Sequence, residues 1–250
     1  MITIVAIGGG NVRTQSTASI DKEIIRLTGK KKPKLLFIPT ASSDDAGYWR
    51  HIEKYFGGHW GCDTDVLYLI KENPSPEEIK QKIGWADIVY VGGGNTLKMM
   101  RLWRRLGVDH LLEAAGRRGA ILCGVSAGSI CWFEFGHSDS MSSYNPDNWQ
   151  YIKVRGLGLI KGIHCPHYDS ATLDVPRKKH FQLMIQKMGG RGIAIDDNCA
   201  LIFSDGAVRV LASQPGARAY LVYKENGKTI ETEIKPQGQS LQAKMLYGTN

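Results

Sequence analysis

The sequence lacks the features of several protein classes. Its 250 residues include five cysteines, and none of these forms a C-x-x-C pair. An odd and scattered set does not make a disulfide framework, which favours a reducing compartment. The opening residues, MITIVAIGGG, lack the basic start and the long apolar stretch of a signal peptide. No apolar run reaches the length of a membrane span. We therefore expect a cytoplasmic protein with no membrane contact.

Linkers and internal repeats are also missing. Hydrophobic residues make up 42% of the chain and charged residues 22%, which is an ordinary globular balance. We expect one domain over residues 1–250. The net charge is +8, but the densest basic cluster, residues 30–34, has no interleaved aromatic side chains that stack on bases. A solvated basic surface is the better interpretation, and no nucleic-acid partner is expected.

Short apolar runs alternate with helical patterns over the first two thirds of the chain. Many of these runs end in glycine and lead into a helix, which indicates an α/β fold with a mostly parallel sheet flanked by helices. The expected strands are Ile2–Ile7, Lys34–Ile38, Thr64–Ile70, Ala86–Val91, Ala120–Cys123, Leu159–Cys165 and Gly192–Ile195. Four short strands after residue 199, with an Asn226-Gly227 turn, predict an antiparallel C-terminal extension of that sheet.

The stretch GVSAG, residues 124–128, places Ser126 directly after one of these strands. A serine between small residues at a strand-to-helix turn is the pattern of a nucleophile elbow. The following helix N-terminus offers free N–H groups to a developing oxyanion. The alternative is a glycine turn with an incidental serine. The motif alone is weak, and its predicted position between strand and helix strengthens it.

A serine nucleophile needs a base, and the base needs an acceptor that fixes its tautomer. His167 follows a strand end at the same edge of the predicted sheet, whereas His164 is expected within the strand. Two adjacent acids, Asp196 and Asp197, follow a further strand. They also fit a turn-capping role. Asp139 is an alternative acid, in the chain order of the α/β-hydrolases.

The glycine loop Gly92–Gly94 lacks the residues of a phosphate-binding loop. We interpret it as backbone that approaches the acyl group and donates an oxyanion N–H. The residues His164, Cys165, His167 and Asp169 match no common zinc spacing. We therefore expect no metal and no cofactor.

Together these motifs resemble the serine peptidases typified by aspartyl dipeptidase (dipeptidase E) and cyanophycinase, within the class I glutamine amidotransferase-like superfamily. The matching pieces occur in family order from near the N-terminus to about residue 203. They are FIPTAS (residues 37–42), VGGGNT (91–96), GVSAG (124–128), PHY (166–168) and GIAIDD (192–197).

The resemblance implies a triad in which Ser126 matches the nucleophile, His167 the base and Asp197 the acid. The family's acid is often Glu, so the choice between Asp197 and Asp196 stays open. The resemblance also implies oxyanion N–H groups from Ala127 and from Gly94 or Gly93.

The family's best-known activity, removal of an N-terminal aspartate from dipeptides, implies residues that bind the substrate. Arg177 is the candidate for the side-chain carboxylate, because its guanidinium can bind a carboxylate bidentately. Asp139 is the candidate for the amine, and Asn95 is a further candidate for substrate binding. A solvated Arg177 in the first turn of a helix is the competing interpretation.

The expected function is therefore a serine exopeptidase that hydrolyses short peptides, with an N-terminal aspartate, through an acyl-enzyme. The alternatives are a cyanophycinase-like isopeptidase acting on aspartyl polymers and a non-catalytic binding protein on the same scaffold. The only expected partner is a short peptide substrate, and homo-oligomerisation stays open.

Overall fold

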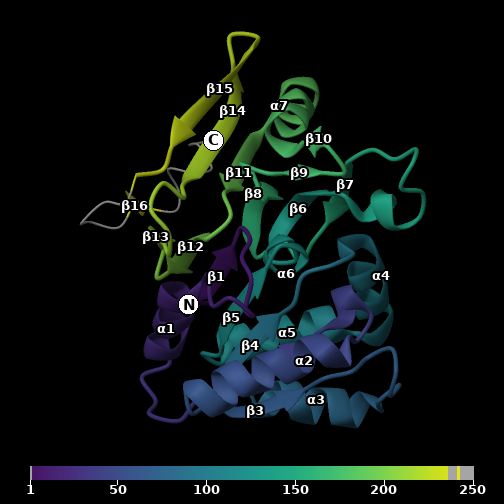
Figure 1. The fold of residues 1–250 in the computed structure, drawn as a ribbon, viewed down its shortest axis with the longest axis vertical. Helices are drawn as coiled ribbons and strands as arrows, with labels where there is room; N and C mark the ends of the chain where they lie inside the picture. The colour runs from purple at the N-terminus through teal and green to yellow at the C-terminus, as the bar shows by residue number, and fades with distance from the viewer. Residues whose placement is uncertain (1, 236–240, 243–250) are drawn as a thin grey trace.

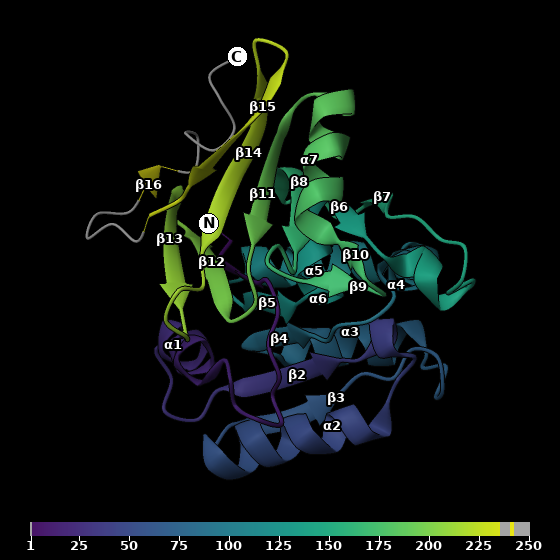
Figure 2. The ribbon, with the colours of Figure 1, turned by 45° about the horizontal axis from the view of Figure 1, so that its top comes forward.

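Two sheets form the centre of the computed structural model, which describes residues 2–235 and 241–242. Figure 1 shows β5 and β4 of the first sheet low in the molecule and β14, β11, β8 and β6 of the second sheet above them. The first sheet has eight strands in the order β16-β13-β12-β1-β5-β4-β2-β3, and the second has six in the order β15-β14-β11-β8-β6-β7. Figure 2 shows both from another side, with β2 and β3 at the far end from β14 and β15.

The first sheet carries the parallel strands that the apolar runs predict. Neighbours from β1 through β5, β4 and β2 to β3 are all parallel, and β12, β13 and β16 continue the sheet antiparallel beyond β1. The strands are β1 Ile4–Ile7, β2 Lys34–Ile38, β3 Asp63–Val66, β4 Ile88–Val91, β5 Ile121–Val125, β12 Cys199–Ser204, β13 Ala207–Ala212 and β16 Leu241–Gln242.

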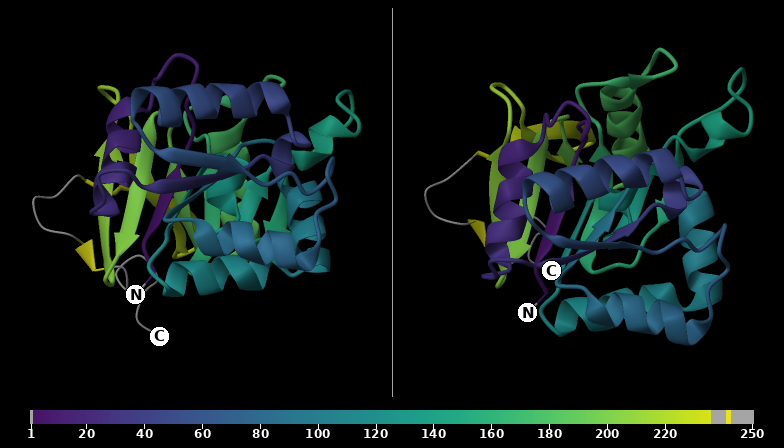
Figure 3. Two further views of the ribbon diagram at one scale, coloured as in Figure 1. Left: turned by 90° about the horizontal axis from the view of Figure 1, so that it is seen from below. Right: turned by 60° about the horizontal axis from the view of Figure 1, so that its bottom comes forward.

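Helices cover both faces of this sheet, as Figure 3 shows. Helices α1 and α2 pack on one face with the side chains of Val5, Leu35 and Phe37, while α3, α4 and α5 pack on the other with Ala6 and Leu36. The alternation along each strand sends neighbouring side chains to opposite faces, so both faces are apolar. The helices are α1 Ala18–Leu27, α2 Ala46–Ile52, α3 Pro76–Trp85, α4 Thr96–Leu106 and α5 Val108–Arg117; a π-helical segment, Glu53–His59, continues α2.

The second sheet differs from the sequence-based expectation of one extended sheet. Its middle strands β11, β8 and β6 are parallel, and its edges are antiparallel. The C-terminal strands divide between the sheets, because β14 and β15 join β11 whereas β12 and β13 join β1. The strands are β6 Phe133–Ser138, β7 Ile152–Arg155, β8 Ile160–Pro166, β11 Arg191–Ile195, β14 Ala219–Glu225 and β15 Lys228–Glu233.

The remaining elements are short, apart from one helix. Helix α7, Arg177–Met188, covers the second sheet through Phe181 and Ile185. The nucleophile motif leads into α6, Ala127–Ile130, which is only four residues long. A small ribbon of β9 Ala171–Thr172 and β10 Val175–Pro176 precedes α7, and 3-10 turns occupy Thr40–Ser42 and Ser140–Ser143. None of the helices within residues 2–235 has the length and apolarity that crossing a membrane requires.

Asp21 is an unusual buried acid in the packing between α1 and the first sheet. It is 1% exposed, and its Oδ2 accepts hydrogen bonds from Thr17 Oγ1 (2.9 Å) and from the Tyr55 hydroxyl (3.3 Å). Its Oδ1 is buried without a hydrogen-bond partner among the described residues. Burial raises the pKa of Asp21 from 3.8 to about 7, because the charged form loses its hydration.

We expect the substitution Asp21→Asn to change how stability depends on pH. Between pH about 4 and about 7 the folded protein keeps a proton on Asp21 that the unfolded chain releases, so the free energy of unfolding falls as pH rises. Asparagine has no such titration. Urea unfolding measures the free energy of unfolding at each pH. From pH about 4 to about 7, the value for Asp21→Asn minus the value for the wild type should therefore rise by about 3 kcal/mol. Parallel pH profiles of the two proteins would contradict the assignment.

Candidate active site

Ser126 stands at a strained turn between β5 and α6. Its backbone dihedral angles are φ 58° and ψ −115°, a conformation that non-glycine residues rarely adopt. The Ser126 N–H donates to the carbonyl of Ile7 at the end of β1 (3.1 Å), which fixes the turn against the neighbouring strand. The side chain is half-buried. This is the backbone geometry of a nucleophile elbow, which lifts a hydroxyl above the carboxyl edge of a sheet.

The two flanking glycines are needed because the turn packs against backbone. A Cβ on Gly124 would lie 2.4 Å from the carbonyl oxygen of Gly128, and a Cβ on Gly128 would lie 2.1 Å from that of Val91. Both distances are far below contact, so any side chain at either position would displace the elbow. The spacing of the small residues in GVSAG thus has a direct steric cause.

His167 and Asp197 form a hydrogen-bonded pair at the ends of β8 and β11. His167 Nδ1 lies 2.7 Å from Asp197 Oδ1, and the Ser170 hydroxyl donates to the other carboxylate oxygen at 2.9 Å. The hydrogen bond with His167 lowers the pKa of Asp197, which keeps the carboxylate ionised. The backbone N–H of Asp197 is held by Asp169 Oδ1 at 3.0 Å. The Nδ1 contact leaves the His167 Nε2 atom free to exchange a proton.

The neighbouring acid, Asp196, points elsewhere. Its Oδ2 accepts the backbone N–H of Arg218 at 3.0 Å, on the side of β14. Burial raises the pKa of Asp196 to about 6, so its charge varies near neutral pH. Of the two adjacent acids that the sequence leaves open, Asp197 is the one that contacts His167.

The end of β1 connects the elbow with the histidine pair. Gly9 lies two residues beyond Ile7, the acceptor of the Ser126 N–H. A Cβ on Gly9 would fall 1.7 Å from Asp197 Oδ1 and 2.4 Å from His167 Nδ1. The Gly9 carbonyl also accepts the N–H of Asn198 at 2.9 Å. Ser126 and the His167–Asp197 pair therefore flank the same strand end.

The glycine loop after β4 lies beside the serine. A Cβ on Gly93 would be 3.9 Å from Ser126 Oγ, while Gly94, with φ +136°, turns tightly against the carbonyl of Ala41. Gly94 and Gly93 both stay predicted donors of the oxyanion N–H. Ala127 begins α6, where a helix leaves its first N–H groups without acceptors.

Arg177 and Asp139 lie together rather than in open solvent. Arg177 is 4% exposed, and its Nη2 donates to Asp139 Oδ2 and, at 3.0 Å, to Thr172 Oγ1. Its guanidinium stacks over the Tyr151 ring at 5.2 Å. Among the described residues Arg177 Nη1 is buried without a hydrogen-bond partner. A solvated arginine is therefore the wrong interpretation, and the two predicted substrate-binding residues are each other's partners.

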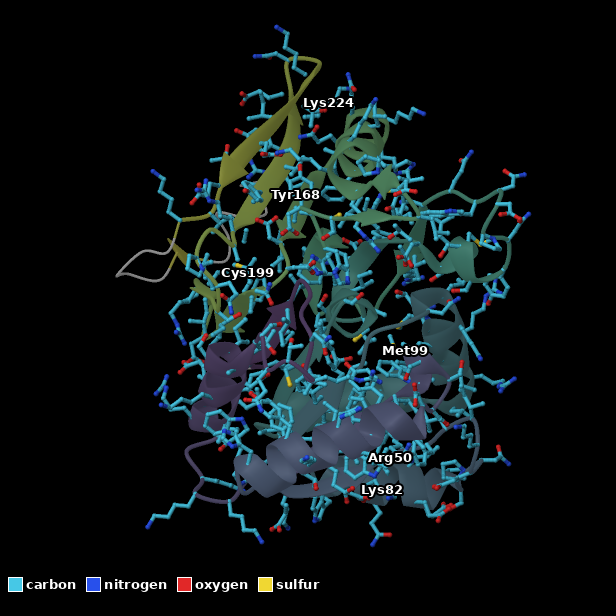
Figure 4. All side chains as sticks on the ribbon, in the orientation of Figure 1. Arg50, Lys82, Met99, Tyr168, Cys199 and Lys224 are labelled. Atoms are coloured by element: carbon cyan, nitrogen blue, oxygen red, sulfur yellow. The ribbon has the colours of Figure 1, made fainter. Side chains whose placement is uncertain are left out.

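A short path of contacts links Arg177 to the histidine pair. The Arg177 N–H donates to the Ser170 carbonyl at 3.1 Å, and the Ser170 hydroxyl binds Asp197. Tyr168, labelled in Figure 4, packs its ring on Phe181 of α7. The buried cation is thus held close to the carboxyl edge of the second sheet.

Asn95 has a structural role. Its Oδ1 caps α4 by accepting the N–H of Lys98 at 2.9 Å, and its Nδ2 donates to the carbonyl of Ser140 at 3.1 Å. Both functional groups of the side chain are thereby engaged within the chain, and a contact between Asn95 and substrate stays a prediction.

The four residues with possible metal-ligand chemistry on β8 and just after it do not converge. His164 Nδ1 faces the carbonyl of Ile193 at 2.9 Å, Cys165 Sγ lies 3.5 Å from His137 Nδ1, and His167 faces Asp197. Within residues 2–235 no three His, Cys, Asp or Glu side chains gather as a metal ion would require.

Several residues at this site escape sequence reasoning. Gly9 has a visible signal, because the glycine run after β1 ends at the same sheet edge as the motif serine. Ser170 and Asp169 carry no pattern that distinguishes them from ordinary loop residues. His137 lies buried within β6, and its Nε2 is 3.0 Å from His180 Nδ1.

Comparison with known proteins gives consistent family matches. The model of peptidase family S51 matches residues 4–211. An uncharacterised peptidase of Bacillus subtilis strain 168, YgaJ, is 34% identical over 224 residues, which are 89% of this chain and 92% of that protein. An uncharacterised peptidase of Listeria monocytogenes, Lmo0363, is 27% identical over 161 residues, covering 62% of this chain and 73% of that protein.

Two solved structures share the fold. A peptidase from an acI-B1 actinobacterium superposes with a TM-score of 0.74 at 19% identity, covering 97% of each chain. A putative peptidase E protein from Listeria monocytogenes EGD-e superposes with a TM-score of 0.63 at 19% identity, covering 85% of this chain and 98% of that one. At this identity the likeness concerns the fold, and it confirms the α/β class that the sequence predicts.

Proposed function

The chain belongs to peptidase family S51, as its motifs indicate, and from this membership we propose that it is a serine exopeptidase. Its substrates are short peptides with an N-terminal aspartate. The observation that carries the proposal is the hydrogen-bonded His167–Asp197 pair at the strand end that also anchors the strained elbow of Ser126.

The reaction proceeds through an acyl-enzyme. His167 Nε2 takes the hydroxyl proton of Ser126 as Oγ attacks the scissile carbonyl carbon. The N–H groups of Ala127 and Gly94 bind the resulting oxyanion. The protonated His167 then gives its proton to the leaving amine, and the carbon–nitrogen bond breaks. Water, deprotonated by the same imidazole, hydrolyses the ester and restores Ser126. Asp197 remains ionised throughout and stabilises the imidazolium.

The Arg177–Asp139 couple explains a preference for N-terminal aspartate. Such a residue carries an ammonium and a carboxylate a few ångströms apart, so a cation beside an anion is its complement. Among the described residues Arg177 Nη1 is a donor without a hydrogen-bond partner, and because it is buried, substrate binding must expose it; Asp139 supplies the acceptor for the amine. Desolvated guanidinium–carboxylate contacts are strong enough to set specificity.

A substrate panel tests this specificity. We expect Asp-Leu to be cleaved much faster than Asn-Leu, N-acetyl-Asp-Leu or Leu-Asp. Arg177→Lys should lower kcat/KM on Asp-Leu by about 10- to 100-fold while changing that on Asn-Leu little, because lysine keeps the charge but loses the planar fork. Equal loss on both peptides would assign Arg177 to folding alone. Preferential cleavage of a β-aspartyl-arginine peptide would favour the isopeptidase, and no cleavage of any peptide would favour a binding protein.

A further inference from the structure

A second serine–histidine pair is buried beneath the elbow. Ser129 Oγ lies 2.8 Å from His164 Nε2, and His164 Nδ1 lies 2.9 Å from the carbonyl oxygen of Ile193. Ser129 and His164 are both 0% exposed, so neither reaches substrate. The His164 ring stacks on Phe133 with ring centroids 4.5 Å apart. The proposed reaction does not use this pair.

The direction of these hydrogen bonds follows from chemistry. A carbonyl oxygen only accepts, so His164 Nδ1 carries a proton. Burial lowers the pKa of His164 to about 3, which keeps the ring neutral and leaves Nε2 as an acceptor. The hydroxyl of Ser129 donates to the Ser126 carbonyl at 2.7 Å, and His164 Nε2, 2.8 Å from Ser129 Oγ, is a second acceptor that shares the same proton. The Ser126 carbonyl also accepts the N–H groups of Ser129 (2.9 Å) and Ile130 (3.0 Å).

This chain of hydrogen bonds joins the three segments that carry the proposed triad. Ser129 lies on α6, one turn after Ser126. His164 lies on β8, three residues before His167, and Ile193 lies on β11, the strand that leads to Asp197. Strands β8 and β11 are already paired with His164 beside Ile193. The Ser129–His164 bond adds the elbow helix to that unit.

Helix α6 needs such an anchor because it has only four residues. A single helical turn does not hold its orientation by its own hydrogen bonds. Ser126 follows a strand of the first sheet, whereas His167 and Asp197 follow strands of the second sheet. A displacement of about 1 Å between nucleophile and base is enough to cost about 100-fold in rate.

We propose that Ser129 and His164 are positioning residues that set where Ser126 stands relative to His167 and Asp197. The inference rests on the proposed serine mechanism. Loss of the Ser129–His164 bond should lower kcat and leave KM nearly unchanged, because the substrate-binding groups lie elsewhere.

The kinetic test compares Ser129→Ala, His164→Asn and His164→Gln with the wild type on Asp-Leu. An asparagine amide reaches the place of Nδ1 and keeps the bond to Ile193, whereas a glutamine amide reaches the place of Nε2 and keeps the bond to Ser129. We expect Ser129→Ala and His164→Asn to lower kcat by about 10- to 100-fold with KM within about threefold of the wild type. His164→Gln should retain more kcat than His164→Asn.

The matched control is Ile24→Val, which removes a methylene from the fully buried face of α1. It should lower the melting temperature with kcat unchanged, which separates lost stability from lost positioning. A wild-type kcat in Ser129→Ala would overturn the inference. Equal kcat values in His164→Asn and His164→Gln would also overturn it.

A second readout does not depend on turnover. Crystal structures of the wild type and of Ser129→Ala should show Ser126 Oγ displaced relative to the His167 ring. Unchanged positions overturn the inference even where no peptide is cleaved. Reaction of the wild type with a fluorophosphonate tests the proposed serine mechanism separately. If Ser126 is not labelled, the proposed function is wrong. The crystal structures then still decide whether Ser129 and His164 position Ser126. Where Ser129→Ala does not fold, nitrogen NMR of the wild type decides, since a His164 ring protonated on Nε2 rather than Nδ1 contradicts the inference.

Discussion

Peptide hydrolysis should fall by about 10⁴- to 10⁶-fold when Ser126 is replaced by alanine, with little change in KM. The size of the loss follows from the mechanism, because the acyl-enzyme cannot form without the Oγ atom. What remains is the binding of substrate and the stabilisation of the oxyanion by backbone N–H groups, which alanine does not remove. Steady-state assays at saturating peptide with purified protein measure kcat, and release of the leaving amine is the signal.

A matched control is Ser19→Ala, which changes an exposed serine on α1. It should retain wild-type kcat and should react with a fluorophosphonate at the wild-type rate, whereas Ser126→Ala should not react at all. If Ser126→Ala kept more than about a tenth of the activity, the nucleophile would have to be another group.

Replacing Asp197 by asparagine should lower kcat by about 10⁴-fold at neutral pH. Asparagine nearly preserves the shape, but it removes the charge that stabilises the imidazolium and fixes the wrong tautomer on His167. Asp197 is the direct partner of His167, because its Oδ1 lies 2.7 Å from His167 Nδ1. Because that hydrogen bond lowers the pKa of Asp197, the carboxylate protonates only below the ordinary range of aspartate. In the wild type, loss of activity through this group should therefore begin only in strongly acidic solution.

The adjacent acid provides a control of equal size. Asp196→Asn should leave kcat within about twofold of the wild type, since the Asp196 carboxylate faces the backbone of Arg218. The pH–rate profiles of both variants, recorded on Asp-Leu, separate the two acids. A large loss in Asp196→Asn together with a mild loss in Asp197→Asn would exchange their roles.

Much of the first sheet follows from local sequence. Apolar runs predicted β1, β2, β4 and β5 to within a few residues, because buried parallel strands are continuously apolar. The runs of β1, β4 and β5 end at glycine, and that of β2 ends at Pro39. Helix α3 begins where Ser75 and Pro76 indicate, and Ser75 caps it together with Glu78. Apolar runs and helix caps involve only a few neighbouring residues, so they can be recognised in a single sequence.

The second sheet cannot be predicted from local sequence in the same way. Strand β6 begins after only two residues beyond α6, and none of the expected strands covers it. Which strands share a sheet depends on contacts between distant segments, and β12 and β14, both predicted only as short C-terminal strands, join different sheets. Local pattern predicts the strands near the C-terminus but not their partners.

At the candidate site, too, local motifs predict some residues, whereas others depend on contacts between distant segments. The motifs predicted Ser126 and His167, and the structure brings both to the end of β1. The choice between Asp196 and Asp197 needed coordinates, because neighbouring residues beyond a strand point in different directions. Ser129 and His164 carry no sequence signal for their contact, since a buried serine on a helix and a histidine within a strand are ordinary packing residues by pattern alone.

The position of β1 at the centre of the first sheet has a consequence for biosynthesis. Strand β1 leaves the ribosome before β5 and β12, which flank it, and Gly9, just after β1, packs on His167 and Asp197. A nascent chain that already contains Ser126 therefore has neither the acid nor the strand that completes the sheet around it. We expect ribosome-bound and prematurely terminated chains to be inert toward peptides, so that proteolytic capacity arises only once synthesis has passed β12.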